Sequence, residues 1–468
     1  MAVKKGKTYQ IEIEDAAYEG KGIGHIDGMA VFVKNTAPGD VVTARIRKKR
    51  KKYCEAQLEE IITPSSIRVE PSCRHADVCG GCTWQHVPYS EQLKFKTRHV
   101  ADHLQRIGGF SDLHVEECLG SDRELNYRNK MEYTFGARRW LTEEEIKQGG
   151  DVEQKYFALG MHIPGRFDRI LDLQECHLQD PISFRILDFV RAYALEHNLR
   201  PYDTHNKKGY LRNLMIRNAT HTDDLMVNIV TYRNKPDQLT PLVDAIMEEF
   251  PEVTTIINNV NDTWSPTAIG RYEEVHHGPG YITEYIHGLS FRVEANTFFQ
   301  TNTLQAEKLY EQALNYAEIT PEDVVYDLYC GVGSLTLCLA QKAKKAVGIE
   351  ISESSIEKAK ENAETNGFTN THFEPGDMKD VFSDEVTEKY GNPDVLVTDP
   401  PRAGMHEDVI HQIRELRPER MVYISCNSST LARDLSLLAD LYSVEQVQPV
   451  DMFPQTYHIE TVARLKLK

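Results

Sequence analysis

The sequence contains no run of about 18 apolar residues, the length that a membrane-spanning helix requires. Its first eight residues are basic and polar, so the apolar core of a secretory signal peptide is missing as well. Both absences argue against a membrane partner and predict a cytoplasmic protein. Cysteine is scarce, at nine among 468 residues, and in a reducing compartment these thiols are not expected to form a disulfide framework.

Positive charge is in deficit over the whole chain. The 54 Lys and Arg side chains stand against 71 Asp and Glu, and the net charge of −17 is unusual for a protein that binds nucleic acid. The deficit is uneven, because residues 1–70 contain 13 basic and 10 acidic side chains. Within them, residues 45–52 place seven Lys or Arg in eight positions. Either RNA contact or a solvated face explains such a run.

A small β-barrel is predicted for residues 1–62. Alternation of apolar and polar residues indicates strands, and turns rich in glycine or carrying Pro-Gly separate them at residues 20–24 and 38–40. The expected strands are residues 9–13, 29–33, 41–47 and 56–62. This pattern is typical of an oligonucleotide-binding barrel. The basic run leads into the last strand of such a barrel, which favours RNA contact over a solvated face.

The middle of the chain is predicted to be rich in β-structure. An amphipathic helix comes first, at about residues 90–107. Its apolar positions fall on one face: Leu93, Val100, Leu104 and Ile107. Strands are then expected at residues 131–135, 156–163, 211–217, 225–231 and 254–260. Residues 140–153 are polar and charged, which predicts a surface loop.

From about residue 289 short apolar strands alternate with helical stretches. Five strands are expected at residues 324–329, 346–350, 372–374, 395–398 and 421–425. Helices such as 352–366 and 407–416 separate most of them, and two more strands, near 444–450 and 460–466, follow without a clear helix between them. Five parallel strands and a closing hairpin predict an α/β fold, a Rossmann-like seven-stranded class I methyltransferase domain. The closing hairpin distinguishes it from ordinary dinucleotide-binding folds.

A glycine turn follows the first of these strands, at residues 327–333 (Asp-Leu-Tyr-Cys-Gly-Val-Gly). Gly331 and Gly333 permit a tight turn and the close approach of a ligand to the backbone. Glu350 ends the next strand, where its carboxylate can accept both hydroxyls of a ribose. The turn lacks the third glycine of the pyrophosphate fingerprint. It therefore favours S-adenosylmethionine, which has no pyrophosphate, over NAD.

Two further acids follow strands of the same sheet. Asp377 comes after the third strand and suits the amino group of an adenine. Asp399 opens the sequence Asp-Pro-Pro-Arg-Ala-Gly after the fourth strand, at the edge where doubly wound sheets bind ligands. A loop stiffened by proline explains the prolines but not the acid at the strand end, and NAD binding has no use for this loop.

The fifth strand ends in a cysteine within Tyr-Ile-Ser-Cys-Asn. Cys426 precedes a predicted helix, whose N-terminus favours the thiolate. Uracil C5 is a poor nucleophile, and attack of a thiolate on C6 activates it for methylation. A base must then remove the C5 proton before the thiolate leaves. Glu460, at the start of the last strand, is the predicted base, with His458 as the alternative. Cys330 and Cys338 are expected to be packing residues.

A third group of cysteines points to a metal. Cys73, Cys79 and Cys82 crowd within ten residues, and Cys176 is available as a fourth ligand. Tetrahedral zinc and a four-iron cluster both accept four thiolates. Zinc sites favour paired short spacings, whereas three clustered cysteines and a remote one suit a cubane better. Reactive free thiols are the remaining alternative.

These motifs together resemble the uracil-5 RNA methyltransferase family, and its 23S rRNA branch in particular. The resemblance spans nearly the whole chain: a TRAM barrel, an iron–sulfur region and a methyltransferase domain. Its most specific parts are residues 327–331, 399–404, 424–427 and 452–454, together with Glu460. It implies a [4Fe-4S] cluster on the four cysteines, Cys426 as nucleophile and Glu460 as base. The S-adenosylmethionine contacts that it implies are Gln300, Tyr329, Glu350 and Asp399.

Three domains are therefore expected, as the length of the chain also requires. They are a TRAM-like RNA-binding barrel at 1–65, a central β-rich domain with the cluster at 66–285 and a methyltransferase domain at 286–468. The early helix is expected to pack on the last. We expect a monomer that acts on 23S rRNA, with tRNA as the alternative.

Two other classes of function stay open. One is an RNA-binding factor without activity, against which the joint presence of Cys426 and Glu460 argues. The other is an enzyme that methylates exocyclic amines, and such an enzyme needs no thiolate.

Overall fold

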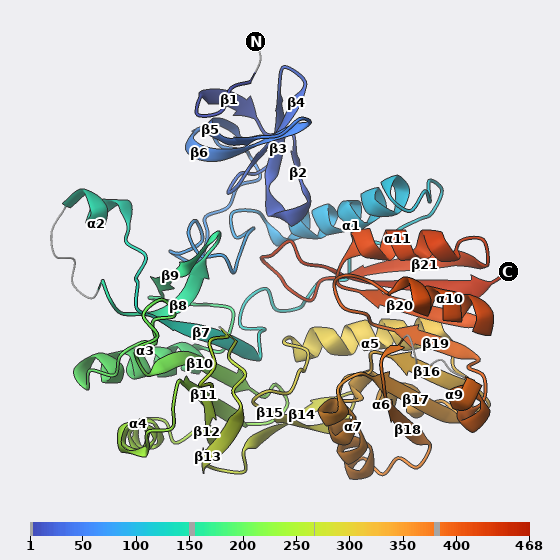
Figure 1. Cartoon of the computed structure of the whole chain (residues 1–468). Helices are drawn as coiled ribbons and strands as arrows, with labels where there is room; N and C mark the ends of the chain where they lie inside the picture. Colours follow the sequence, from blue (N-terminus) through green and yellow to red (C-terminus); the bar gives the residue numbers. More distant parts are fainter. Residues whose placement is uncertain (1–2, 149–154, 266, 379–383) are drawn as a thin grey trace.

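The computed structural model describes residues 3–148, 155–265, 267–378 and 384–468. Three large sheets follow one another along the chain, with a two-stranded hairpin between the second and the third. Figure 1 shows the N-terminal sheet above the other two, and helix α1 (Tyr89–Arg106) lying between it and the C-terminal sheet. No helix in the described part of the chain is long and apolar enough to cross a membrane.

The N-terminal sheet has six strands in the order β1-β5-β6-β4-β3-β2. They are β1 (Thr8–Glu12), β2 (Asp15–Ala16), β3 (Gly22–Ile26), β4 (Met29–Val33), β5 (Val41–Lys49) and β6 (Tyr53–Thr63). Small aliphatic side chains on their inner faces form a separate core: Val31, Val33, Val42, Ala44 and Ile46. The four predicted strands correspond to β1, β4, β5 and β6, and β2 and β3 were not expected.

The segment predicted as a glycine turn at residues 20–24 contains most of β3, so this prediction was wrong. A Cβ on Gly24 would lie 2.1 Å from the carbonyl oxygen of Glu12, and a Cβ on Gly22 would lie 2.2 Å from Oγ1 of Thr36. These glycines therefore let two strands cross closely. The bend itself is the preceding 3-10 helix η1 (Tyr18–Gly20).

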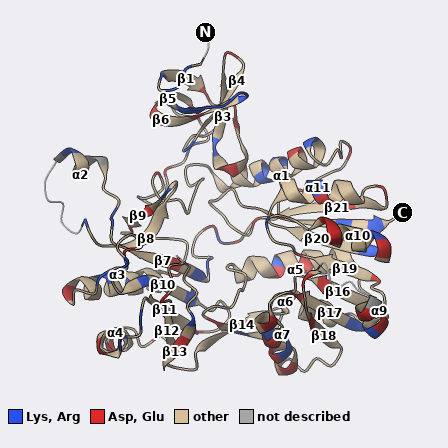
Figure 2. Cartoon of the chain, viewed as in Figure 1, with Lys and Arg blue, Asp and Glu red and all other residues tan. Residues whose placement is uncertain are grey.

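The basic run occupies the end of β5 and the turn into β6. Its seven Lys and Arg side chains are all exposed, and Figure 2 shows blue segments on the barrel where they lie. Arg45 pairs with Glu59 at 2.7 Å and Lys48 pairs with Glu55 at 3.0 Å. The basic side chains of the run thus form a charged rim of the barrel, and only Ile46 among residues 45–52 belongs to the barrel core.

The central sheet has seven strands in the order β13-β12-β11-β10-β7-β8-β9. The five predicted strands are confirmed: β7 (Lys130–Gly136), β8 (Ala158–Ile163), β10 (Leu211–Asn218), β11 (Leu225–Thr231) and β12 (Thr255–Val260). Four elements were missed: β9 (Arg166–Asp172), β13 (Tyr272–His277), α3 (Pro181–Glu196) and α4 (Pro236–Glu249). Both helices share one core with the sheet, because their buried aliphatic side chains pack with those of β10 and β11.

The polar segment at 140–153 was expected to be an irregular loop. It contains the helix α2 (Glu143–Gln148), and residues 149–154 lie outside the described residues. Thr142 precedes the helix, accepting the N–H of Glu145 at its hydroxyl and donating its own N–H to the Glu145 carboxylate. This reciprocal capping box explains why a polar stretch starts a helix here.

A hairpin leads into the last domain. It comprises β14 (Tyr281–Ile286) and β15 (Leu289–Glu294), and α5 (Thr303–Ala317) follows. The N–H groups of Ser290 and Arg292 donate to side chains of Asn366 and Asn362. The hairpin spans the boundary expected at residue 285, and these contacts tie β15 to the C-terminal domain.

The C-terminal sheet confirms the predicted α/β fold. Its order is β18-β17-β16-β19-β20-β22-β21, with the first five strands parallel and β22 antiparallel to both of its neighbours. The strands are β16 (Val324–Leu328), β17 (Lys345–Glu350), β18 (Thr371–Pro375), β19 (Val395–Thr398), β20 (Arg420–Ser425), β21 (Tyr442–Val450) and β22 (Glu460–Leu467). The helices after α5 are α6 (Ser334–Ala340), α7 (Glu353–Thr365), α9 (Asp384–Tyr390), α10 (Glu407–Leu416) and α11 (Ser428–Leu438).

Helix α1 packs on this sheet domain as expected. Val100 and Leu104 are buried in one cluster with Leu431 and Leu435 of α11, whereas Ile107 is 48% exposed just after the helix ends. The helix therefore connects the barrel above it to the catalytic edge of the sheet below.

Candidate active site

The carboxyl ends of the parallel strands bring predicted cofactor-binding residues together with the predicted nucleophile. Tyr329 follows β16, Glu350 ends β17, Asp399 follows β19 and Cys426 follows β20. These four strands are consecutive neighbours in the sheet, in the order β17-β16-β19-β20. Glu460 begins β22, which pairs with β20 in the antiparallel sense, so it starts at the same edge. This is the edge where doubly wound sheets bind their ligands.

The turn after β16 is tightly wound. Tyr329, Gly331 and Gly333 have φ values of 65°, 55° and 78°. For a tyrosine this left-handed conformation costs roughly 1–2 kcal/mol, and such strain is concentrated at functional sites. A Cβ on Gly333 would lie 3.1 Å from the side chains of Ala359 and Phe373. A Cβ on Gly331 would meet no described atom within 4 Å, so the backbone there is open to a ligand.

The acid at the end of β17 is tied to this turn. The Gly331 N–H donates to Oε2 of Glu350 at 3.3 Å, and the Ser352 N–H donates to Oε1 at 2.9 Å. Burial raises the pKa of Tyr329 to about 12, and the nearby charge of Asp377 adds to the rise. Asp377, which follows β18, is thereby near the turn, as its expected role at the adenine requires.

Gln300 lies between β15 and α5, in a segment that the fold fixes at both ends. Its carbonyl accepts a hydrogen bond from Nδ2 of Asn129 at 2.8 Å. Two residues on, Asn302 caps α5 and donates to the carbonyl of Met452 at 3.0 Å. The segment therefore reaches the loop between β21 and β22, the same loop that leads to Glu460.

The loop at residues 399–405 is held against the helix that follows Cys426. Nδ2 of Asn427 donates to the Arg402 carbonyl at 3.0 Å, and Oγ1 of Thr430 donates to the same oxygen at 3.3 Å. The N–H of Met405 donates to Oδ2 of Asp434 at 2.9 Å. The acid-bearing loop and the cysteine-bearing loop are thus joined into one unit.

Cys426 is half-buried, and its thiol is less acidic than expected. Burial raises its pKa from 9.0 to about 11, the charges of Glu460 and Asp399 add to the rise, and Arg402 opposes it. The N-terminus of α11 is still expected to favour the thiolate, but burial and the two carboxyl groups favour the protonated thiol in the free chain.

The two carboxyl groups beside the thiol are also perturbed. Burial raises the pKa of Glu460 well above its usual value, and the charge of Asp399 adds to the rise. Withdrawal from water raises the pKa of Asp399 to about 7. Like charges in a poorly hydrated site disfavour double ionisation. The pair therefore retains a proton at a higher pH than isolated carboxyl groups do, and strongly perturbed acids of this kind mark functional sites.

Arg402 was quoted in a motif but given no role in the sequence analysis. Its charge lowers the pKa of Cys426 and Glu460 and also that of His458. The guanidinium is therefore the cation common to all three reactive groups. Its position three residues after the strand-end acid is the signal that could have identified it.

His458 is a poor base in this structure. Burial lowers its pKa to about 4, and the charges of Arg402, Lys96 and Arg128 add to the effect. It lies in the loop before β22, not in the strand itself.

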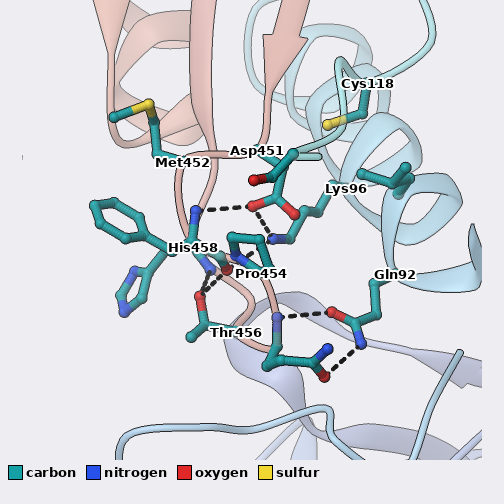
Figure 3. Close-up of polar contacts among 12 residues, drawn as sticks. Gln92, Lys96, Cys118, Asp451, Met452, Pro454, Thr456 and His458 are labelled. Atoms are coloured by element: carbon teal, nitrogen blue, oxygen red, sulfur yellow. Dashed lines mark hydrogen bonds and ion pairs between the residues drawn. The ribbon is translucent and has the colours of Figure 1, made fainter. Parts of the chain in front are cut away.

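The loop from Asp451 to His458 is anchored by α1 (Figure 3). Nζ of Lys96 donates to Oδ1 of Asp451 at 2.6 Å, and neither side chain is exposed. Nε2 of Gln92 donates to Oε1 of Gln455 at 3.0 Å, and the Gln455 N–H donates back to Oε1 of Gln92 at 3.0 Å. The approach to Glu460 is therefore fixed by a helix from another part of the chain.

The four predicted cluster ligands line one enclosed pocket. Cys73, Cys79, Cys82 and Cys176 share it with apolar side chains that include Met131. Burial raises the pKa of Cys82 to about 12, and the charges of the other three cysteines add to the rise. The described residues contain no group of three or more His, Cys, Asp or Glu side chains arranged to hold a metal ion. The four thiols therefore share one pocket but do not form a metal site in this arrangement. Cys330 and Cys338 are buried in the core, as expected.

Comparison with known proteins gives consistent similarities. Residues 281–468 match the family model described as tRNA (Uracil-5-)-methyltransferase, and residues 2–58 match the TRAM domain. An uncharacterised RNA methyltransferase of Chlorobaculum tepidum is 45% identical over 98% of this chain and 96% of its own length. One of Bacteroides thetaiotaomicron is 42% identical over 97% of this chain and 100% of its own.

A solved structure is similar over almost the whole fold. It is the Pyrococcus abyssi tRNA (uracil-54, C5)-methyltransferase in complex with S-adenosyl-L-homocysteine. The TM-score is 0.75 at 26% identity, and the match covers 98% of this chain and 100% of the other.

Proposed function

The chain belongs to the uracil-5 RNA methyltransferase family, and on that premise we propose that it methylates C5 of a specific uridine in 23S rRNA through a covalent adduct with Cys426. The methyl donor of the family is S-adenosylmethionine. One observation carries the mechanism: a thiol and a buried carboxyl group lie at the same edge of the sheet, because Ser425, before Cys426, pairs with Thr461, after Glu460. A C5 methylation by way of a C6 adduct needs these two groups, one as nucleophile and one as base.

The proposed reaction begins with transfer of the Cys426 thiol proton to water. The thiolate sulfur forms a bond to C6 of the uracil, and the electron pair of the C5–C6 double bond moves toward O4 as an enolate. C5 then forms a bond to the methyl carbon of the donor sulfonium, whose sulfur leaves as a neutral thioether. The carboxylate of Glu460 removes the C5 proton, and the C5–C6 double bond re-forms as the sulfur leaves C6.

The raised pKa values assign a role to the neighbouring groups. The thiol is protonated in the free chain, so the cation of Arg402, which lowers its pKa, favours the attacking form. The carboxyl pair of Asp399 and Glu460 retains a proton, and ionised Glu460 is a stronger base than an exposed carboxylate. A pKa nearer the working pH suits a general base.

The glycine turn fits the methyl donor. The backbone at Gly331 is open, and Glu350 is held at the strand end by two backbone N–H groups. We propose that Glu350 accepts the ribose hydroxyls, that Asp377 accepts the adenine amino group, and that Gln300, Tyr329 and Asp399 complete the site. When bound, the donor supplies an electrophilic methyl group.

We further propose that Cys73, Cys79, Cys82 and Cys176 hold a [4Fe-4S] cluster. In support, all four thiols line one pocket, and the resemblance to the 23S rRNA branch of the family implies a cluster on these four positions. The cluster would supply rigidity, by joining the segment after the barrel to the loop before α3, since methyl transfer requires no electron transfer.

A second substrate, tRNA, is favoured by a specific observation. The solved relative of similar fold is named as a methyltransferase of uracil-54 in tRNA. The proposed catalytic groups act on the uracil itself, so they are compatible with either RNA. The similarity of the cysteine region to the 23S rRNA branch favours ribosomal RNA.

The proposal is tested with purified protein, methyl-labelled S-adenosylmethionine and two unmodified RNAs, 23S rRNA fragments and total tRNA. Label is expected at C5 of one or more uridines in 23S rRNA, located by mass mapping. Label found only in tRNA would show that tRNA, and not 23S rRNA, is the substrate. Label on an exocyclic amine would overturn the chemistry.

A further inference from the structure

A row of half-exposed rings passes the catalytic cysteine. The ring centroids of Tyr18 and Tyr457 are 6.0 Å apart at 74°, and those of Tyr457 and His458 are 4.2 Å apart at 35°. His458 lies 6.2 Å from Phe453 at 81°, and the guanidinium of Arg128 lies 5.7 Å from the Phe453 ring. Each of the four rings keeps part of its surface in solvent. They form a continuous border from the barrel to the central sheet.

The first ring of this row comes from the barrel. Tyr18 is in η1, and the charge of a Cys426 thiolate contributes to raising its pKa to about 12, after burial and Tyr457. Arg402 opposes the rise. The tyrosine is therefore within electrostatic range of the nucleophile and of the cation beside it. Tyr18 thus lies near Cys426, although the two residues are 408 positions apart in the chain.

The barrel is fixed in this position by α1. His99 hydrogen-bonds through Nε2 to the Ala16 carbonyl at 2.8 Å, and Arg98 forms an ion pair with Asp15. The ring of His103 packs edge-on against Tyr18 at 4.8 Å, and its Nδ1 hydrogen-bonds to Oγ of Ser428, the first residue of α11. One helix therefore couples the barrel tyrosine to the helix that follows Cys426.

We propose that Tyr18 and Tyr457 form a stacking platform for unpaired nucleotides next to the target uridine, so that the barrel completes the active site and the enzyme selects single-stranded RNA. The inference rests on the proposed function in one respect, the assignment of Cys426 to the reacting carbon. Aromatic rings beside cations are the usual means of binding single strands, because every base has a face to stack and the cations meet the phosphates. Arg128 and Arg402 supply cations along this row.

A duplex cannot use such a platform. Its bases are already stacked on one another, and both C5 and C6 of a uracil must leave the helix to meet a thiol at the bottom of a site. Flanking bases released by that opening lose their stacking partners. The tyrosines replace those partners at the point where the strand is opened.

The test measures binding of a fluorescein-labelled 12-nucleotide single-stranded RNA of mixed sequence with 2-aminopurine at its centre. Wild-type protein should bind it more tightly than the same sequence as a duplex and should quench the 2-aminopurine. Tyr18→Leu and Tyr457→Leu should each weaken binding about ten- to a hundredfold and relieve the quenching, the range expected when one base stack is removed. Tyr18→Phe keeps the ring and should bind as wild type does.

Controls separate stacking from folding and from the proposed chemistry. Tyr272→Leu removes an exposed tyrosine on β13, at the bottom of Figure 1, and should leave binding unchanged. Each variant should bind S-adenosylmethionine with wild-type affinity, which shows that the fold is intact. Unchanged binding and quenching in Tyr18→Leu, or equal affinity of the wild type for duplex and single strand, would overturn the platform. Wild-type protein that binds and quenches but transfers no methyl group would overturn the proposed function instead.

Discussion

Burial raises the pKa of Glu460, at the start of β22, and the charge of Asp399, which follows β19, adds to the rise although the two residues are 61 positions apart in the chain. The sheet order brings them together, because β20 alone separates β19 from β22. Both carboxyl groups lie beside the Cys426 thiol and raise its pKa. The thiol and the two carboxyl groups therefore disfavour one another's ionisation, and the positive charge of Arg402 partly offsets this effect.

The effect of these charges on the ionisation of Cys426 predicts how its thiol reacts with iodoacetamide. With a pKa of about 11, the thiolate fraction of Cys426 should grow roughly tenfold per pH unit from pH 7 to 9, and alkylation with it. Glu460→Gln removes a carboxyl group whose charge raises the thiol pKa, and should speed alkylation at the pH values where that group is ionised. Arg402→Gln should slow it. The rates are measured by mass spectrometry of the peptide that contains Cys426. Equal rates in Glu460→Gln and wild type would show that the carboxyl group does not act on the thiol.

The buried pair of Lys96 and Asp451 predicts a large loss of stability. Asp451→Ala leaves the Lys96 ammonium buried without its partner, and should lower the free energy of unfolding by about 3–5 kcal/mol. The double variant Lys96→Met with Asp451→Leu should lose less, because no charge stays buried. Urea denaturation followed by fluorescence measures both. A single variant as stable as wild type would contradict the anchoring role assigned to this pair.

The cysteine pocket predicts a coloured protein. Anaerobically purified chain should be brown and contain about four irons, and Cys79→Ser should bleach it and lower its melting temperature. Cys54→Ser, in the barrel core, should keep the iron. Iron and zinc are measured by elemental analysis. Colourless protein with one zinc per chain would show that the four cysteines hold a tetrahedral zinc ion and not an iron–sulfur cluster.

The basic rim of the barrel predicts a change in salt dependence. Replacing Arg47, Lys48, Lys49 and Arg50 by glutamine should weaken RNA binding and lower the slope of log K against log salt by up to about 0.7–0.9 for each phosphate that is no longer neutralised. Turnover at saturating RNA should stay near wild type. Neutralising Lys342 and Lys344, also exposed, is the control and should leave the slope unchanged. An unchanged slope in the fourfold variant would show that these basic side chains do not contact RNA and only face the solvent.

The catalytic sheet was predictable because its central strands β16, β17, β19 and β20 are short apolar runs, each followed by or ending in polar residues. Asp399, Cys426 and Glu460 each lie next to such a run, so strand order alone placed them at one edge. The helices α3 and α4 were missed although a signal was present. Leu239, Leu242, Val243 and Ile246 recur at the spacing of a helix, and all four are buried.

Other features depend on long-range packing that no local pattern encodes. The strand β3 was predicted as a turn because its glycines serve a close crossing with Glu12 and Thr36, which lie in other segments. The raised pKa of Cys426 follows from burial beside Glu460 and Asp399, and helix position alone suggested the reverse. The approach of Tyr18 to the site depends on how the barrel docks on α1.

The separate roles of Cys426 and Glu460 predict different stalled states on ordinary uridine RNA. Glu460→Gln should still add and methylate, but the C5 proton has no positioned base. Removing a general base typically slows its step about 10²–10⁴-fold. A methylated adduct should therefore accumulate on a denaturing gel. If Glu460→Gln turns over normally, another group is the base, and His458 becomes the first candidate.

The most direct test of the covalent mechanism uses RNA with 5-fluorouridine at the target and S-adenosylmethionine. Wild-type protein should add to C6 and methylate C5, and then stall, because fluorine cannot leave as a proton does. The account predicts a stable protein–RNA adduct of the wild type and of Cys338→Ala, and neither adduct nor product with Cys426→Ala. Methylation of uridine by Cys426→Ala would contradict the covalent mechanism and the central claim with it.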